Sequence, residues 1–230
     1  MGFMYTLVGF FSGGGLFMLP IAVVAAVGAA IAIERYVTLA RLGAANRRAW
    51  SEVQPLLAGG DFDKAREVTS KADTAIAQVL SMGLARQGAV RRREDVEVAM
   101  EECMMEIVPQ LEKRTHYLAT FANLATLLGL LGTVSGLIHA FGAVATVNPA
   151  EKANLLSASI SEAMNCTAFG LMTAVPLVFI HAFLQTKTIE LVTGLEMACT
   201  KFLNAVTERS TLRAQGRLGL VQPQAQAAQA

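Results

Sequence analysis

The stretches GLLGTVSG at residues 129–136 and EAMNCTAFG at residues 162–170 decide the fold of this chain. Each is an apolar run compatible with a helix, and each carries a threonine among glycine and alanine residues. Small residues let two helices approach closely inside a membrane, where packing and hydrogen bonds hold helices together. The two stretches therefore predict two closely packed membrane helices that present hydroxyl groups to a buried environment.

The composition of the whole chain indicates a membrane protein. Of the 230 residues, 53% are hydrophobic and 16% are charged, well below the roughly one quarter that is typical of soluble domains. A membrane-spanning helix needs about 20 apolar residues, and three stretches meet this need: 16–33, 118–144 and 164–184. Since no segment alternates like a β-strand, we expect an all-α integral membrane protein with three transmembrane helices.

The distribution of lysine and arginine predicts how these spans are oriented. Of the 19 basic residues, 13 lie between the first and second spans, one lies between the second and third, and five follow the third. Cytoplasmic loops are enriched in these residues. We therefore expect the N-terminus and the segment 145–163, a loop and the start of the third helix, to be periplasmic. The C-terminus is expected to be cytoplasmic. A net charge of +1 gives no basic footprint for nucleic acid.

The segments at the two ends of the chain are expected to lie outside the spans. Residues 1–15 predict a helix along the outer membrane surface, the alternative being a longer and tilted first span. Residues 211–230 are rich in glutamine and alanine and are expected to be a disordered tail.

The segment 34–117 is expected to form a cytoplasmic helical domain, in which Asp61 caps a helix that starts at residue 62. From Glu94, apolar residues recur at helical spacing into the second span, which predicts one helix of about 50 residues that Pro109 kinks. The same spacing continues after the third span over 185–210. These two apolar stripes are expected to pack together.

No residue pattern supports an enzyme, a cofactor or a metal site. The chain has neither a nucleotide-binding motif nor a catalytic triad motif. Its cysteines, Cys103, Cys166 and Cys199, have no zinc-type spacing and fall on the expected cytoplasmic side or in the membrane, where disulfides are rare.

Polar residues inside the expected spans carry the functional prediction. Asn123, Thr126 and Thr133 follow helical spacing and share one stripe of the second span. Glu162 lies near the outer end of the third helix, just before its span, and the span carries four further candidates, Asn165, Thr167, Gly170 and Thr173. Such a cluster predicts a hydrated or proton-accessible pathway.

Two alternatives remain for these residues. An intramembrane threonine often donates its hydroxyl to a carbonyl of its own helix, and Glu162 has the alternative of a solvated acid at the membrane surface near a helix N-terminus. The spans contain no Asp, Glu, Lys or Arg near the bilayer centre, where a carrier of protons needs an ionisable group. A conducting protein of this kind would need that group from another polypeptide.

Residues 129–136 and 162–176, with the expected three spans and external N-terminus, resemble the MotA/TolQ/ExbB proton-channel family and most closely its ExbB/TolQ branch. The resemblance implies a homo-pentamer in the bacterial inner membrane, surrounding single-span partners of the ExbD/TolR type. It implies that an Asp of the partner carries H⁺, that Thr133 and Thr167 face this Asp, and that Glu162 matches the acid before the third-span motif. Gly129, Gly132, Gly136 and Pro176 would pack the helices.

The resemblance also implies that ion flow drives mechanical work across the periplasm, with a periplasm-spanning protein of the TonB/TolA type as a further partner. Asn165 and Ser135 depart from the family pattern and keep Na⁺ as an alternative ion. A gliding-motility stator of the same family is a second alternative. A non-conducting membrane scaffold is the alternative of a different class.

Overall fold

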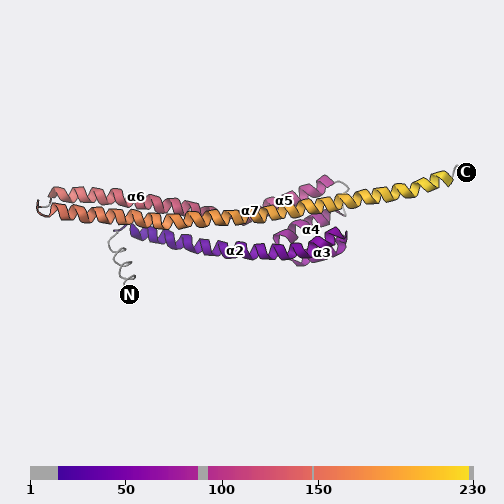
Figure 1. Ribbon diagram of the computed structural model, residues 1–230, viewed down its shortest axis with the longest axis horizontal. Helices are drawn as coiled ribbons and strands as arrows, with labels where there is room; N and C mark the ends of the chain where they lie inside the picture. The colour runs from indigo at the N-terminus through magenta and orange to yellow at the C-terminus, as the bar shows by residue number, and fades with distance from the viewer. Residues whose placement is uncertain (1–14, 88–92, 147, 228–230) are drawn as a thin grey trace. The chain divides into compact units, whose positions relative to one another are not determined.

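The computed structural model describes residues 15–87, 93–146 and 148–227, and these residues form helices without any strand. The helices are α2 (Met18–Ala58), α3 (Phe62–Lys71), α4 (Ala75–Gln87), α5 (Arg93–Glu112), α6 (Thr115–Thr146) and α7 (Lys152–Ala227) (Figure 1). The expected all-α fold is confirmed. The expected interfacial helix at 1–15 falls almost entirely outside the described residues.

Three helical stretches of the described chain are long and apolar enough to cross a membrane: Met18–Ala58, Arg93–Ala145 and Lys152–Arg209. The second and third contain the expected spans 118–144 and 164–184, and the first contains the expected span 16–33 except for its first two residues. The chain divides into two compact units, of which unit 1 is Met1–Val37 with Lys113–Thr186 and unit 2 is Thr38–Glu112 with Lys187–Ala230. Because α2 and α7 contribute to both units, each unit is described by itself.

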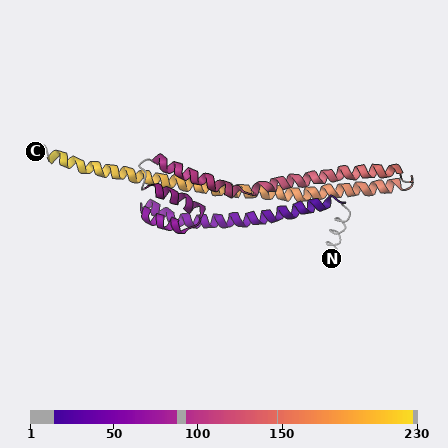
Figure 2. The ribbon, with the colours of Figure 1, turned by 180° about the vertical axis from the view of Figure 1, so that it is seen from behind.

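Unit 1 is built on a close contact between α6 and α7, which lie side by side in both views (Figures 1 and 2). A Cβ atom added at Gly170 would lie 2.7 Å from the carbonyl oxygen of Ala125, and one added at Gly129 would lie 3.3 Å from the Cα atom of Gly170. The two backbones therefore touch: only glycine fits at 170, and a side chain at 129 would push the helices apart by a few tenths of an ångström. Helix α2 completes the unit with Gly28, which faces Leu177 of α7.

Further along the same contact, Gly132 faces Cys166 and Gly136 faces Ala163. The three glycines of the 129–136 stretch thus all lie against α7, where small residues allow close packing. Pro176 is exposed in the single chain, so its packing role stays a prediction that would involve another chain.

One end of unit 1 carries a group of polar contacts. The Arg35 side chain is only 5% exposed, and its Nε atom donates to Oγ1 of Thr115 at 3.3 Å. The Nδ1 atom of His181 lies 3.0 Å from the carbonyl oxygen of Thr115, so its hydrogen bond requires the Nδ1–H tautomer. Arg114 pairs with Glu34 at 2.5 Å. The burial of Arg35 is thus compensated by hydrogen bonding.

The structure corrects the expectation of one continuous helix from Glu94 through the second span. Helix α5 ends at Glu112 and α6 begins at Thr115. The break falls at Arg114, whose φ of 67° lies in the left-handed region, which an α-helix cannot include. Pro109 remains inside α5 and is not the point of the break.

Unit 2 has its own apolar core. Helices α3, α4 and α5 enclose it with parts of α2 and α7, and fully buried side chains include Leu80, Leu84, Met100, Leu195 and Phe202. Met100 comes from the α5 stripe, and Leu195 and Phe202 come from the stripe after the third span. These two stripes share one core, as their spacing predicts.

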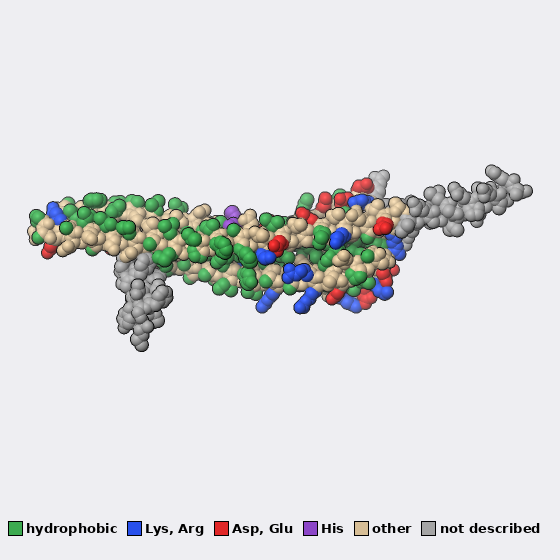
Figure 3. All heavy atoms as spheres, in the orientation of Figure 1, with side chains coloured by type: hydrophobic (Ala, Val, Ile, Leu, Met, Phe, Trp, Pro, Cys, Tyr) green, Lys and Arg blue, Asp and Glu red, His purple; other side chains and the backbone are tan. Residues whose placement is uncertain are grey.

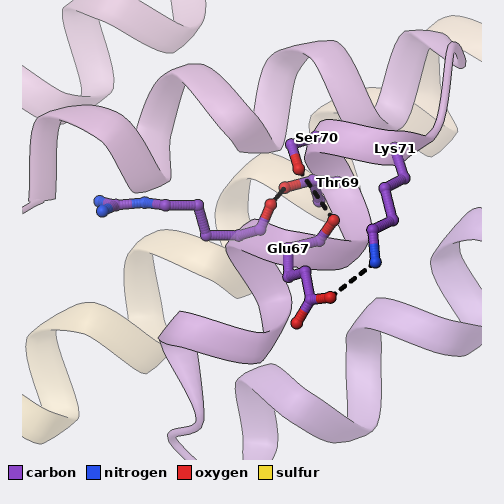
Figure 4. Close-up of polar contacts among 5 residues, drawn as sticks. Glu67, Thr69, Ser70 and Lys71 are labelled. Atoms are coloured by element: carbon purple, nitrogen blue, oxygen red, sulfur yellow. Dashed lines mark hydrogen bonds and ion pairs between the residues drawn. The ribbon is translucent and has the colours of Figure 1, made fainter.

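Side-chain contacts with nearby residues cap the N-terminus of the short helix α3 and hold polar groups on its exposed face. Asp61 caps its N-terminus by accepting from the backbone N–H of Lys64, as predicted, and hydrogen bonds from the Lys64 side chain and backbone lower the pKa of the Asp61 carboxyl. Near the other end, Lys71 pairs with Glu67 at 2.6 Å, and the Ser70 hydroxyl donates to a carbonyl of its own helix (Figure 4).

Helix α7 continues to Ala227, through residues for which the sequence predicts a disordered tail from residue 211. Alanine and glutamine are favourable helix formers, which is consistent with helical backbone in this composition.

We predict that Gly170→Ala destabilises the protein by about 1–3 kcal/mol, because the added methyl group collides with the backbone of α6. The matched control is Gly142→Ala on α6, where a Cβ atom meets nothing within 4 Å and alanine should add up to about 1 kcal/mol of helix stability. Denaturant unfolding in detergent measures both. Equal effects of the two variants would contradict the close contact.

Candidate functional site

The polar stripe predicted on the second span lies outside the contact between α6 and α7. Asn123 and Thr126 are exposed and Thr133 is half-buried, whereas the residues of α6 that face the unit interior include Ala122, Ala125 and Gly129. At about 100° per residue, the centre of the polar stripe is roughly a quarter turn from the buried one. The chain's own described helices leave this stripe uncovered.

The threonine hydroxyls of this stripe donate to carbonyls of their own helix. Thr126 Oγ1 donates to the carbonyl of Ala122 at 3.1 Å, and Thr133 Oγ1 donates to that of Leu130 at 2.6 Å. A hydroxyl that donates its proton keeps lone pairs with which to accept. Both threonines therefore present acceptor oxygens outward.

Thr167 behaves differently, because its hydroxyl donates across the helix contact to the carbonyl of Gly129 on α6, at 2.8 Å. It is half-buried. This bond joins the two stretches that define the sequence signature, 129–136 and 162–170. Gly170 and Thr173, predicted to support a pore face, are buried within unit 1 instead.

Glu162 lies at a separate cavity of about 480 Å³ within unit 1. Three segments form its wall: residues 15–17 just before α2, about two turns of α6 (132–139) and about two turns of α7 (159–166). The polar residues that line it are Ser135, His139, Ser159 and Glu162. Gly15 contacts the Glu162 carboxylate so closely that a Cβ atom would displace its Oε1, and the φ of 71° at this position favours glycine.

Sequence reasoning missed three of the four polar residues at this cavity. The signal was present, because Ser135 and His139 are four residues apart on one helix and Ser159 and Glu162 are three apart on another, so each pair shares a face. Which faces meet depends on how the helices pack.

The third-span candidates do not share one face of α7. Glu162 and Thr167 are five residues apart, which places them about 140° apart around the helix axis. Asn165 is half-buried and is about 160° from Thr167 on the same reckoning. Helix α7 begins at Lys152, ten residues before Glu162, so the helix dipole, which acts within the first turn, does not stabilise this carboxylate as expected.

The fold and the site define an all-helical membrane protein with intramembrane polar groups on closely packed helices. Residues 71–197 match the MotA/TolQ/ExbB proton channel family, and this match includes both signature stretches. The chain belongs to that family.

Relatives of the chain carry the names of the ExbB/TolQ branch. The Tol-Pal system protein TolQ of Haemophilus influenzae is 36% identical over 89 residues, which are 39% of each chain. The biopolymer transport protein exbB1 of Vibrio cholerae is 35% identical over 115 residues, half of each chain. An ExbB-like protein of Synechocystis is 26% identical over 172 residues, covering 74% of this chain and 81% of that protein. The chain thus spans half or less of the first two of these relatives, and the resemblance to the ExbB/TolQ branch is confirmed.

We predict that Thr167→Val lowers the free energy of unfolding by about 1 kcal/mol, because it removes a hydrogen bond between two helices. Thr133→Val is the matched control, since it removes only a bond within one turn of α6 and should change stability by less than about 0.5 kcal/mol. Unfolding of both variants in detergent tests the difference. A larger loss in Thr133→Val would contradict the placement of the Thr167 hydroxyl.

Proposed function

We propose that this chain is the ring-forming subunit of an ion-driven motor of the ExbB/TolQ type in the bacterial inner membrane. The ring couples proton flow to mechanical work across the periplasm, together with a single-span partner of the ExbD/TolR type. The N-terminus is periplasmic and the C-terminus cytoplasmic. The chain is not an enzyme and needs no cofactor, and the transported ion is H⁺.

The observation that carries this proposal is the uncovered polar stripe of α6. Asn123 and Thr126 are exposed on a helix whose other exposed side chains are mostly apolar, such as Leu127 and Leu130. A polar group facing lipid costs free energy unless it finds a partner. Further copies of the chain, five in a ring as in the family, would enclose this stripe around a central partner helix.

The chain itself lacks the group that would carry the proton. No Asp, Glu, Lys or Arg lies within 118–144 or 164–184, and Glu162 precedes the third expected span. The outward lone pairs of Thr133 suit an acceptor role toward a protonated carboxyl group, which an Asp of the partner's membrane helix would supply. The proton path then requires two polypeptides.

A non-conducting scaffold is the second candidate function. The local hydrogen bonds of Thr126 and Thr133 favour it, because they already satisfy both hydroxyl donors. In a scaffold these hydroxyls would serve only helix packing, and no proton flux would be observed.

We predict that vesicles containing the ring alone leak few protons, because a charge crossing the bilayer core unaided meets a barrier of several kcal/mol. Flux driven by a pH gradient should appear when the partner is added. It should disappear when the partner's membrane Asp is changed to Asn, although the complex still forms.

A further variant in the same assay, Thr133→Val, should assemble with the partner and lose most of the flux. Proton-sensitive dye inside the vesicles measures each case. Equal flux in every preparation would place the ion path within this chain, and absence of flux in the complete complex would favour the scaffold.

We predict that Glu162→Gln lowers flux through the assembled complex roughly tenfold, because a carboxylate at a cavity concentrates cations at its mouth. The control is Glu151→Gln, an exposed acid in the segment before α7, which should leave flux unchanged. Native mass measurement checks that both variants assemble. Full flux in Glu162→Gln over a range of external pH would identify Glu162 as a solvated surface acid.

A further inference from the structure

Helix α5 of unit 2 carries an exposed stripe in which acidic and apolar residues alternate. Glu94, Val98, Glu101 and Met105 follow one another at spacings of four, three and four residues, and Glu97 lies three residues from Glu94 and four from Glu101, so all five share one side of the helix. The side chains of Val98 and Met105 are 52% and 73% exposed. Contiguous exposed apolar surface can mark a protein–protein contact, and Met105 also lines a groove beside this stripe.

A groove of about 550 Å³ runs beside this stripe, between α5 and α7 within unit 2. Met104 and Met105 line its floor with Leu203, and Glu97, Glu101 and Glu196 stand among its lining residues. Methionine side chains are flexible and adapt to the shape of a partner. The groove therefore suits an occupant that is partly apolar and positively charged.

The negative charge of α5 is largely unpaired. The helix contains seven acidic residues and one basic residue, Arg93. Within the part of the chain that the structure describes, Glu97 alone among these acids has an ion-pair partner, Arg93 at 4.0 Å. Figure 3 shows the acidic side chains gathered along α5.

Helix α2 presents the complementary surface within unit 2. Arg41, Arg47 and Arg48 are exposed, and among the described residues none of the three pairs with a carboxylate. Arg41 and Arg48 are seven residues apart and share one stripe with Ala44 and Ala45. The small side chains between the arginines leave room for a neighbouring helix.

We propose that the α5 stripe and its groove bind the arginine stripe of α2 from a second copy of this chain. Arg41 and Arg48 are separated by seven residues, as are Glu94 and Glu101, and both pairs span about 10.5 Å along their helices. Val98, between the two glutamates, would lie against Ala44 and Ala45 of the other copy. The contact joins different surfaces of the two copies, and repetition of such a contact closes a ring. This inference rests on the ring of the proposed function and names the surfaces that build it.

Charge reversal on the intact chain tests this contact. Glu94→Arg with Glu101→Arg, or Arg41→Glu with Arg48→Glu, should convert the oligomer into 24.4 kDa monomer in native mass measurement. Combining all four substitutions should restore the oligomer, which a merely misfolded variant would not do. The matched controls are Glu106→Arg, about 140° from Glu101 on α5, and Arg47→Glu, about 100° from Arg48 on α2; both should assemble normally.

A cross-link then locates the contact directly. One copy carries Ala44→Cys and a differently tagged copy carries Val98→Cys, so that a mixed disulfide must join two chains. We expect oxidation to produce the mixed dimer, with no such product when Glu106→Cys replaces Val98→Cys. If the wild-type chain is oligomeric but neither charge reversal nor cross-link has these effects, the contact is wrong while the ring stands. A monomeric wild-type chain would overturn both.

Discussion

The backbone contact between Gly129 of α6 and Gly170 of α7 is the constraint on which the rest of unit 1 depends. Because neither residue has a Cβ atom, the helices approach until the Thr167 hydroxyl reaches the Gly129 carbonyl at 2.8 Å. The same approach turns Gly132 and Gly136 toward α7 and leaves the stripe of Asn123 and Thr126 facing away. Close packing on one side thus determines which polar groups remain for contacts with other chains.

The polar groups of unit 1 serve at least two separate places. Thr167 belongs to the helix contact, whereas Glu162 lines a cavity with Ser135, His139 and Ser159. The two places lie about 140° apart around α7. The polar residues of one chain therefore do not form a continuous path along one face of α7. An ion path in this family would need a surface shared between copies and partners, which agrees with a protein that has no carboxylate in its expected spans.

Much of this architecture follows from local chemistry and was predictable. Long apolar runs form helices that can span a membrane, and the apolar spacing of Met100 on α5 and of Leu195 and Phe202 on α7 predicted their place in a core. Asp61 at a helix start could be read as a cap. The break at Arg114 was not predictable from spacing, because apolar periodicity continues across it and no glycine or proline marks it. The break is visible in the left-handed φ of Arg114, which only the folded backbone shows.

The sequence by itself determined the all-helical class, the three membrane-spanning candidates, the family and the residue types that face close contacts, because these depend on composition and on residues near one another in the chain. Only the tertiary structure decided which polar residues meet. Periodicity assigns a residue to a face of its own helix, but the rotation of each packed helix selects the face that it turns inward. For that reason Gly170 and Thr173 are buried, His139 joins Glu162 at a cavity, and the α6 stripe remains outward.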